Sequence, residues 1–251
     1  MSNPPPKTDG RIAIFSDVHA CLEALQAVLA SISARGISRI LFLGDILGYG
    51  PDPAECLRLL RAGAQVCLLG NHDAMAADAG FDLSRLSAPV AIPLDLARKQ
   101  LDAGEMLWLE ERPLTWNAEG LEASHAGLHN PGLFIHLETP EQVRRHFSRQ
   151  TAAISFFGHT HVPVVYGVDE RDRLRMAPGE EGEILLGAPG RYAVGVGSVG
   201  FSRDDDPRAC WVEFLPDTPG VIFHRVEFDA GAAARRTAAM LAGPAGVAGW
   251  D

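Results

Sequence analysis

A short apolar run that ends in a cluster of polar residues recurs in the first third of this chain, and this repeat strongly constrains the fold. The apolar runs are 12–15, 40–43 and 65–69, and the polar clusters after them are 17–19, 44–45 and 70–73. Asp17 and Asp45 are 28 residues apart, and Asp45 and Asn71 are 26 apart, close to the roughly 30 residues of a strand–helix–strand unit. Helical patterns over 22–34 and about 53–62 fill the two intervals. The sequence therefore predicts three parallel strands joined by crossover helices.

The remainder of the chain predicts more helices and then a series of strands. Helices are expected over about 90–101, 105–111 and 230–241, and strands over 121–124, 154–157, 162–168, 183–186, 192–196, 210–215 and 221–228. We expect these strands to form a second, antiparallel or mixed sheet. The predicted fold class is α/β, with two packed mixed β-sheets flanked by helices. We predict a flexible N-terminal arm over 1–10, one domain over 11–241 and a C-terminal tail over 242–251.

Charge and composition narrow the range of partners and compartments. The chain has 22 basic and 32 acidic residues and a net charge of −10, which argues against binding to long nucleic acids or to anionic membranes. No apolar run approaches the roughly 20 residues of a membrane span, and the first ten residues are polar with three prolines, unlike a signal peptide. The four cysteines show no CxxC spacing. We therefore expect a cytoplasmic protein that does not contact a membrane.

The polar clusters contain the side chains that a pair of metal ions would need. Clusters that follow neighbouring parallel strands meet at one edge of a sheet, and two later clusters, 124–127 and 158–161, also follow apolar runs. Seven potential ligands can then converge: Asp17, His19, Asp45, Asn71, His125, His159 and His161. Carboxylate, imidazole and amide ligands suit two divalent first-row ions better than a cysteine-rich structural zinc site. Two such ions can clamp a phosphoryl group, so the pattern predicts phosphoester hydrolysis.

Each cluster taken alone has an ordinary structural explanation. Gly44-Asp45 could be a simple turn, Asn71 a left-handed turn residue and His125 a buried core histidine. His159 and His161 could face solvent from an edge strand. The argument for a metal site rests on five clusters in this order, each after an apolar run.

These motifs resemble those of the calcineurin-like metallophosphoesterase superfamily. The matching segments are Asp17-x-His19, Gly44-Asp45, Gly70-Asn71-His72-Asp73, His125 and Gly158-His159-Thr160-His161, in that order, and the likeness spans about 11–230. It implies a four-layer α/β/β/α fold. The segments 44–51, 55–56, 197–200 and 203–204 further resemble the bacterial and archaeal branch of small phosphodiesterases related to the YfcE type.

The resemblance also implies a role for each site residue. One metal would be bound by Asp17, His19 and His161, the other by Asn71, His125 and His159, and Asp45 would bridge the two. His72 would act as the general acid that protonates the leaving group, while a metal-bound hydroxide attacks phosphorus. Asp73 would either orient His72 or cap a helix. The expected cofactors are two divalent ions, with Mn²⁺ favoured and Fe, Zn or Ni as alternatives.

Substrate contacts and one departure from the family pattern leave alternatives open. Arg203 could pair with a phosphate group or with the nearby aspartates at 204–206, and Tyr49 could stack on a base or cover the core. Cys21 stands where close relatives carry asparagine, so it could be a soft metal ligand, an oxidation-sensitive thiol or a small buried hydrophobe. The remaining histidines, His129, His136, His146 and His224, are expected outside the site.

The sequence therefore predicts a metal-dependent phosphoesterase, with phosphodiesters of nucleotide type or other small diesters as substrates. A phosphomonoesterase and a dinucleoside polyphosphate hydrolase are alternatives of the same class. A noncatalytic metal-binding interaction scaffold is an alternative of another class. The expected partner is a small phosphoester, and the oligomeric state stays open.

Overall fold

The computed structural model describes residues 10–187 and 190–243, and its first sheet has six strands in the order β3-β2-β1-β11-β12-β9. These strands are β1 (Ile12–Phe15), β2 (Arg39–Phe42), β3 (Val66–Cys67), β9 (Gly182–Leu185), β11 (Ala209–Leu215) and β12 (Gly220–Val226). Strands β1, β2 and β3 are parallel, and β11 pairs with β1 in the antiparallel sense. The three predicted parallel strands are thus confirmed.

The second sheet also has six strands, in the order β4-β5-β6-β10-β7-β8. They are β4 (Thr115–Ala118), β5 (Leu121–Ser124), β6 (Ile154–Phe157), β7 (Pro163–Val168), β8 (Leu174–Pro178) and β10 (Arg191–Val196). Strands β5, β6 and β10 are parallel, whereas β4, β7 and β8 pair antiparallel with their neighbours. Both sheets are therefore mixed, as predicted.

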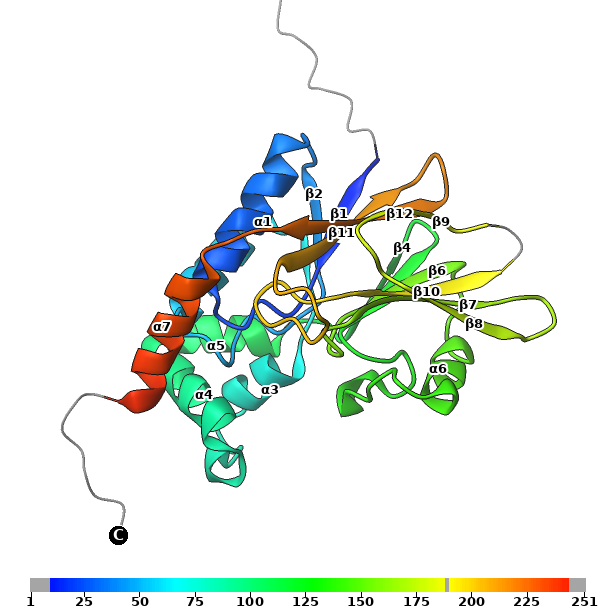
Figure 1. The fold of residues 1–251 in the computed structure, drawn as a ribbon. Helices are drawn as coiled ribbons and strands as arrows, with labels where there is room; N and C mark the ends of the chain where they lie inside the picture. Colours follow the sequence, from blue (N-terminus) through cyan, green and yellow to red (C-terminus); the bar gives the residue numbers. More distant parts are fainter. Residues whose placement is uncertain (1–9, 188–189, 244–251) are drawn as a thin grey trace, which may run out of the picture.

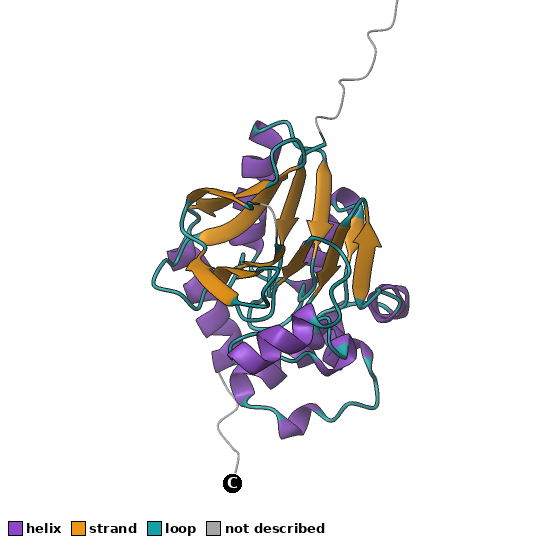
Figure 2. Cartoon of the chain, turned by 90° about the vertical axis from the view of Figure 1, so that its right-hand side faces the viewer, coloured by secondary structure: helices purple, strands orange, loops and turns teal. Residues whose placement is uncertain are grey.

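The helices lie on the outer faces of the two sheets (Figure 1). They are α1 (Leu22–Ala34), α2 (Pro53–Gly63), α3 (Asn71–Ala77), α4 (Ala88–Gln100), α5 (Ala103–Glu110), α6 (Pro140–Phe147) and α7 (Ala230–Ala242), with short 3₁₀ turns η1 (Leu83–Arg85) and η2 (Pro131–Leu133). Pro53 stands in the first turn of α2, where its missing N–H has no intrahelical partner in any case. Figure 2 shows the strands in the upper part of the molecule, with helices behind and below them.

Alternating side chains on the strands create three apolar layers. Ile12 and Ile14 of β1 join the core between the two sheets, whereas Ala13 and Phe15 face the helices beside the first sheet. The outer face of the second sheet packs against α6 through Val143 and Phe147. This is a helix–sheet–sheet–helix arrangement, in which the inner faces of the two sheets form one core.

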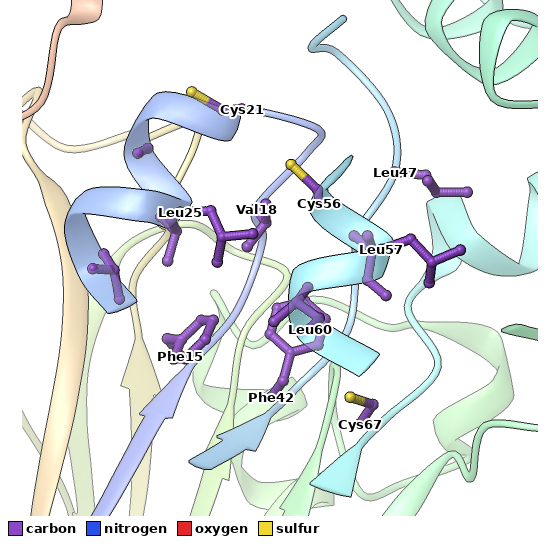
Figure 3. Close-up of a cluster of buried hydrophobic side chains, with 14 of the residues drawn as sticks. Phe15, Val18, Cys21, Leu25, Phe42, Leu47, Cys56, Leu57, Leu60 and Cys67 are labelled. Atoms are coloured by element: carbon purple, nitrogen blue, oxygen red, sulfur yellow. The ribbon is translucent and has the colours of Figure 1, made fainter. Parts of the chain in front are cut away.

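Three cysteines belong to the core beside the first sheet. Figure 3 shows Cys21, Cys56 and Cys67 among aliphatic and aromatic side chains from β1, β2, α1 and α2. Burial raises the pKa of the Cys21 thiol to about 11, so the sulfur stays protonated at neutral pH. Of the three roles considered for Cys21, this environment matches the small buried hydrophobe.

Several predicted elements need correction. The strands β9, β11 and β12 join the first sheet and not the second. Strand β3 has only two residues, and the loop expected after it begins helix α3 at Asn71. Two edge strands, β4 and β8, and helix α6 were not predicted. The side chains of β4 and β8 are exposed or half-buried, and α6 has few apolar residues, so the sequence patterns of these elements are weak.

The predicted arm at 1–10 and tail at 242–251 lie almost wholly outside the described residues, and the assignment of 11–241 to one domain stays a prediction. Within the described part of the chain, no helix has the length and apolar character needed to cross a membrane.

Candidate metal centre

Five strands of the two sheets deliver polar residues to one place. The carboxyl ends of β1, β2 and β3 precede Asp17, Asp45 and Asn71, and those of β5 and β6 precede His125 and His159. Backbone hydrogen bonds tie the loops together: the amide of Asp17 donates to the Gly44 carbonyl at 3.0 Å. The amide of His159 donates to Asp17 Oδ2, also at 3.0 Å, and so joins the two sheets.

The loops require unusual backbone conformations. Five of the expected ligands have left-handed φ values: Asp17 at 58°, His19 at 51°, Asp45 at 61°, His159 at 64° and His161 at 60°. Non-glycine residues adopt this region at a cost of about 1 kcal/mol or more, and such strain is common at functional sites. The surrounding fold therefore holds these side chains in positions that local preference would not choose.

Glycine is required where the loops come closest. A Cβ atom on Gly70 would lie 2.0 Å from Asp45 Oδ1, and one on Gly158 would lie 2.1 Å from Ser16 Oγ. Because neither position has room for a methyl group, the glycines that precede Asn71 and His159 are explained by close packing around the site.

The expected ligands form two adjacent groups, and Asp45 lies between them, close to His19 of the first and His125 of the second. In the first group, Asp17 Oδ1 lies 3.3 Å from His161 Nε2 and 3.8 Å from His19 Nε2. In the second, Asp45 Oδ2 lies 3.3 Å from His125 Nε2, and Asp45 also groups with His159. Asn71 Oδ1 is 3.1 Å from His125 Nε2. All seven predicted ligands are thus close together.

Backbone carbonyls set the tautomers of three histidines. The Nδ1 atoms face carbonyl oxygens as follows: His19 with Leu47 at 2.9 Å, His125 with Leu43 at 3.1 Å and His161 with Phe201 at 2.5 Å. Since a carbonyl only accepts hydrogen bonds, each Nδ1 donates a proton to it in the neutral ring. Each Nε2 then directs a lone pair into the site, the arrangement usual for metal-binding histidines.

These donor atoms fit a cation better than they fit one another. The Nε2 atoms of His19 and His161 are 3.1 Å apart, a separation compatible with two nitrogens at about 2.0–2.1 Å from one ion. Asp17 Oδ1 and His159 Nε2 are buried and have no hydrogen-bond partner among the described residues. Buried polar atoms are rarely left in this state, so the residues present match a metal centre.

Burial and mutual charge shift the pKa values of this cluster in opposite directions. Burial would favour the neutral form of Asp45, but His125 holds the pKa of that carboxyl well below its usual range. Burial opposes the charge on His125, yet Asp45 raises the pKa of that imidazole to about 9. Burial lowers the pKa of both His19 and His159 to about 3. The carboxylates therefore stay ionised and create a strong demand for positive charge.

Asp73 organises the loop after β2. Its carboxylate accepts hydrogen bonds from the amides of Asp45 at 2.9 Å, Ile46 at 3.2 Å and Leu47 at 3.0 Å. Burial and the neighbouring Asp45 raise the pKa of Asp73 to about 7. Its Oδ2 also accepts from the amide of Gly70, the N-cap residue of α3, at 3.4 Å. Of the two roles expected for Asp73, these contacts match the helix cap, extended to the loop after β2, and no contact to His72 is seen among the described residues.

His72 lies against the first group. Its ring centroid is 4.8 Å from that of His19, and its backbone amide donates to Asp45 Oδ1 at 2.9 Å. The Nδ1 atom is buried without a hydrogen-bond partner among the described residues, and burial lowers the pKa of the ring. A ligand atom of His72 also groups with His19 and Asp45 at metal-binding distances, so geometry alone allows either a ligand or a proton donor.

The two expected substrate contacts lie at the rim. Tyr49 stacks on Phe201, with centroids 4.6 Å apart and planes at 15°, and its ring also contacts His19 and His72. Arg203 is exposed, and its charge helps to lower the pKa of His136 after the larger effect of burial.

The aspartates near Arg203 pair with other arginines. Asp204 bonds Arg225, and Asp206 bonds Arg208. No ion pair joins Arg203 to these aspartates in the described ranges, so its guanidinium stays available at the rim.

Sequence reasoning missed the segment between β5 and α6. His136 was expected outside the site, but its ring centroid lies 4.0 Å from that of His159, and the Phe134 ring lies 5.9 Å from that of His125. The one usable signal was Asn130-Pro131-Gly132, which marks a turn directly after a ligand-bearing loop.

Comparison with known proteins identifies the family. A family model described as calcineurin-like phosphoesterase matches residues 10–163. The chain belongs to the calcineurin-like phosphoesterase family. The resemblance inferred from the sequence motifs is confirmed, and the two six-stranded sheets with flanking helices have the metallophosphoesterase fold.

Individual members of the family extend the match over most of the chain. An uncharacterized protein of Methanocaldococcus jannaschii is 35% identical over 222 residues, covering 87% of this chain and 88% of that protein. The crystal structure of a metallophosphoesterase from Sphaerobacter thermophilus superposes with a TM-score of 0.78 at 31% identity, covering 91% and 93% of the two chains.

A named enzyme matches a shorter region. The symmetrical bis(5'-nucleosyl)-tetraphosphatase of Pectobacterium atrosepticum is 35% identical over 126 residues, which is 46% of this chain and 42% of that protein. The chain thus matches less than half the length of this relative. Membership of the calcineurin-like phosphoesterase family indicates that this protein is a hydrolase. Its groups of histidines and aspartates could hold metal ions.

Proposed function

We propose that this protein is a dimetal-dependent phosphoesterase that hydrolyses phosphodiester bonds of small, nucleotide-type substrates. The observation that carries the proposal is the pair of His/Asp groups that meet at Asp45. The unpartnered Asp17 Oδ1 and His159 Nε2 support it, because both buried atoms lack a partner that a cation would provide.

The ligand sets follow from the two groups. Asp17, His19 and His161 would hold one cation, Asn71, His125 and His159 the other, and Asp45 would contact both. When bound, two divalent cations would lower the pKa of a water nucleophile and neutralise charge on the phosphoryl group. The oxygen and nitrogen donors favour Mn²⁺, with Fe, Zn and Ni as alternatives.

The protein's own residues would complete the site. We assign His72 as the group that holds a proton and delivers it to the leaving-group oxygen, because its ring lies beside His19 and its Nδ1 has no other described partner. Arg203 would attract the anionic phosphate, since its exposed guanidinium has no carboxylate partner among the residues described. Tyr49 would cover the substrate from its stack with Phe201.

A dinucleoside polyphosphate is the second candidate substrate class. The match to a bis(5'-nucleosyl)-tetraphosphatase favours it, and the Arg203 side chain could neutralise part of a polyphosphate. The acidic net charge of −10 still disfavours long nucleic acids. The cytoplasmic location remains a prediction from the sequence.

The first test compares a diester with a monoester. Metal-stripped protein should hydrolyse bis-p-nitrophenyl phosphate once Mn²⁺ is added, and faster than it hydrolyses p-nitrophenyl phosphate. Asp45→Asn serves as the inactive control, since it removes the carboxylate shared by both groups. A clear preference for the monoester would replace the phosphodiesterase assignment with a phosphatase assignment. Absence of turnover with Mn²⁺, Fe²⁺, Zn²⁺ and Ni²⁺ would favour the noncatalytic interaction scaffold.

A further inference from the structure

An apolar pocket opens directly beside the second ligand group. It has a volume of about 560 Å³, and its lining includes Asn71 and His159. Its apolar walls are Ala74, Met75, Phe81, Leu133 and Phe134, and we call this cavity the ring pocket. Because two of its lining residues are also expected metal ligands, the pocket adjoins the proposed metal site and could hold another part of a substrate bound there.

The segment that forms one wall of the ring pocket has a strained backbone. Asn130 and Phe134, on either side of η2, have left-handed φ values of 52° and 48°. The Phe134 ring meets the His125 ring nearly edge-on, at 72°. A bulky residue adopts this backbone region at a cost, and the result here is an aromatic face beside the second ligand group.

The opposite wall is fixed by an arginine from α4. The Arg98 guanidinium donates to the carbonyl oxygens of Met75 at 2.9 Å, Ala76 at 3.0 Å and Phe81 at 3.1 Å. These bonds hold the end of α3 and the following loop, and so place Met75 and Phe81 in the pocket wall. The cavity is therefore largely formed before any substrate binds.

The charge of the pocket determines which part of a substrate it can accept. Its lining contains no lysine or arginine, and its titratable side chains are Asp78, His136 and His159. A phosphate would meet no cation there, whereas a flat ring would contact two phenylalanines and a methionine. The site's exposed cation, Arg203, lies outside this lining, and so the pocket suits the uncharged organic part of the substrate.

We propose that the ring pocket binds a flat aromatic or heteroaromatic ring on the ester substituent that stays attached to phosphorus. This inference rests on the proposed phosphodiesterase function. His72 and Tyr49 lie together on the His19 side of the site, and the ring pocket lies on the His159 side. The leaving group that His72 would protonate and the retained ring would therefore lie on different sides of the site, and a diester would fill both.

The test varies the retained substituent and keeps the leaving group constant. With Mn²⁺-loaded protein, phenyl p-nitrophenyl phosphate should have a kcat/KM at least about tenfold higher than methyl p-nitrophenyl phosphate, as expected for burying one aromatic ring. Phe134→Ala and Phe81→Ala should reduce this ratio to about threefold or less. Met176→Ala is the matched control, since Met176 is 69% exposed on β8 and outside the pocket.

A nucleoside probe distinguishes the two sources of such a ring. If a nucleobase is the natural occupant, thymidine 5'-(p-nitrophenyl phosphate) should exceed the phenyl ester in kcat/KM, and Phe134→Ala should remove that advantage. A phenyl ester that matches or exceeds the nucleotide would support an aryl substituent. Both results agree with the ring pocket and differ only in the class of ring.

A binding measurement separates failure of this inference from failure of the proposed function. Calorimetric titration of the Mn²⁺-loaded protein should show phenylphosphonate binding more tightly than methylphosphonate, and Phe134→Ala should remove most of that difference. Equal affinities, together with equal turnover of the phenyl and methyl diesters, would overturn the ring pocket while leaving the phosphodiesterase intact. Absence of all turnover would instead contradict the function, and the phosphonate affinities would still decide the pocket.

Discussion

The chemistry of the candidate metal centre depends on single nitrogen and oxygen atoms that have no hydrogen-bond donor facing them. The Nδ1 atoms of His19, His125 and His161 face backbone carbonyls, so the Nε2 atoms have no proton to donate inward in the neutral rings. Asp17 Oδ1 completes this set as a buried acceptor with no described donor. Buried acceptors without a donor are stable when a cation lies among them, which is the physical basis for assigning metals here.

The role of His72 can be separated from that of a ligand by changing the leaving group. His72→Ala should lower turnover of an alkyl ester by about 100-fold or more, because an alkoxide needs a proton to depart. Turnover of a nitrophenyl ester, which needs little protonation, should fall much less. Steady-state kinetics on both esters provide the measurement, and imidazole added to the buffer should partly restore the alkyl reaction.

Metal content is the control for this variant. Elemental analysis should find the same metal-to-protein ratio in His72→Ala as in the unmodified protein. A lost metal would make His72 a ligand, as its grouping with His19 and Asp45 also allows, and equal losses on both esters would remove the general-acid role.

A second histidine, outside the proposed ligand set, connects pH to stability. His146 is fully buried, its Nδ1 accepts from the Leu128 amide at 3.1 Å, and its Nε2 lies 2.8 Å from Ser155 Oγ. Burial lowers the pKa of this ring to about 3 from an ordinary value of 6.5. The unfolded chain therefore binds more protons between these two values, and stability decreases as the pH falls through that window.

His146→Gln should remove this part of the pH dependence, because an amide does not titrate. Between pH 7 and pH 5 the unmodified protein should lose about 2 kcal/mol more stability than the variant. Urea denaturation of both proteins at each pH measures this difference in stability. The contributions of the other histidines are the same in both proteins and cancel in the comparison. Parallel losses in the two proteins would show that His146 is protonated as easily in the fold as in the unfolded chain.

At the scale of elements, the site depends on how strands and helices end. Strands β1, β2, β3, β5 and β6 all end one to four residues before a functional residue. Asp73, in the first turn of α3, accepts from three amides of the loop after β2. Helix α3 has only seven residues, too few to be stable alone. Its position therefore depends on contacts at both of its ends.

Arg98 provides the contact at the C-terminal end of α3, where carbonyl oxygens lack intrahelical partners. Arg98→Met keeps the apolar part of the side chain and removes bonds to Met75, Ala76 and Phe81. We expect a loss of about 2–3 kcal/mol in the free energy of unfolding and a higher KM for substrates that carry a ring. Urea denaturation and steady-state kinetics provide the two measurements.

Lys99→Met is the matched control on the same helix. Lys99 is 70% exposed and pairs only with Asp95 among the ion pairs described, so its removal should cost about 0.5 kcal/mol or less. Similar losses in both variants would mean that α3 does not depend on the Arg98 hydrogen bonds.

The whole molecule brings the ligands together by packing two mixed sheets face to face. Side chains from both sheets, including Ile14, Phe156, Val194 and Val212, form the core between them. The amide of His159 reaches Asp17 Oδ2 across this junction. Bound cations would connect the sheets further, because each proposed ligand set takes residues from both.

Metal binding should therefore raise the thermal stability of the complete chain. A site at 100 times its Kd adds about 2.7 kcal/mol, and about 2–4 °C per kcal/mol is typical for chains of this size. Addition of Mn²⁺ to chelator-treated protein should raise Tm by about 5–10 °C, as measured by calorimetry. Asp45→Asn should lose most of this shift, and an unchanged shift would show that Asp45 is not shared by the two ions.

The sequence by itself determined the local part of this structure and the composition of the centre. The parallel strands β1, β2 and β3, helices α1 and α2 and all seven proposed ligands follow from apolar periodicity and from the order of polar clusters. Such signals are local, since strand and helix periods are encoded within about ten neighbouring residues. Family membership also followed from the motifs, and the comparisons confirm it.

Only the tertiary structure decided how distant segments combine. Strand β11 pairs with β1 across about 200 residues of sequence, and no periodicity specifies such a partner. The edge strands β4 and β8 were missed because few of their side chains are buried. Phe81, Phe134 and His136 carry no motif, and their relation to the centre arises because separate loops meet around it. Long-range packing, which a local pattern does not contain, therefore shaped the pocket beside the candidate metal centre.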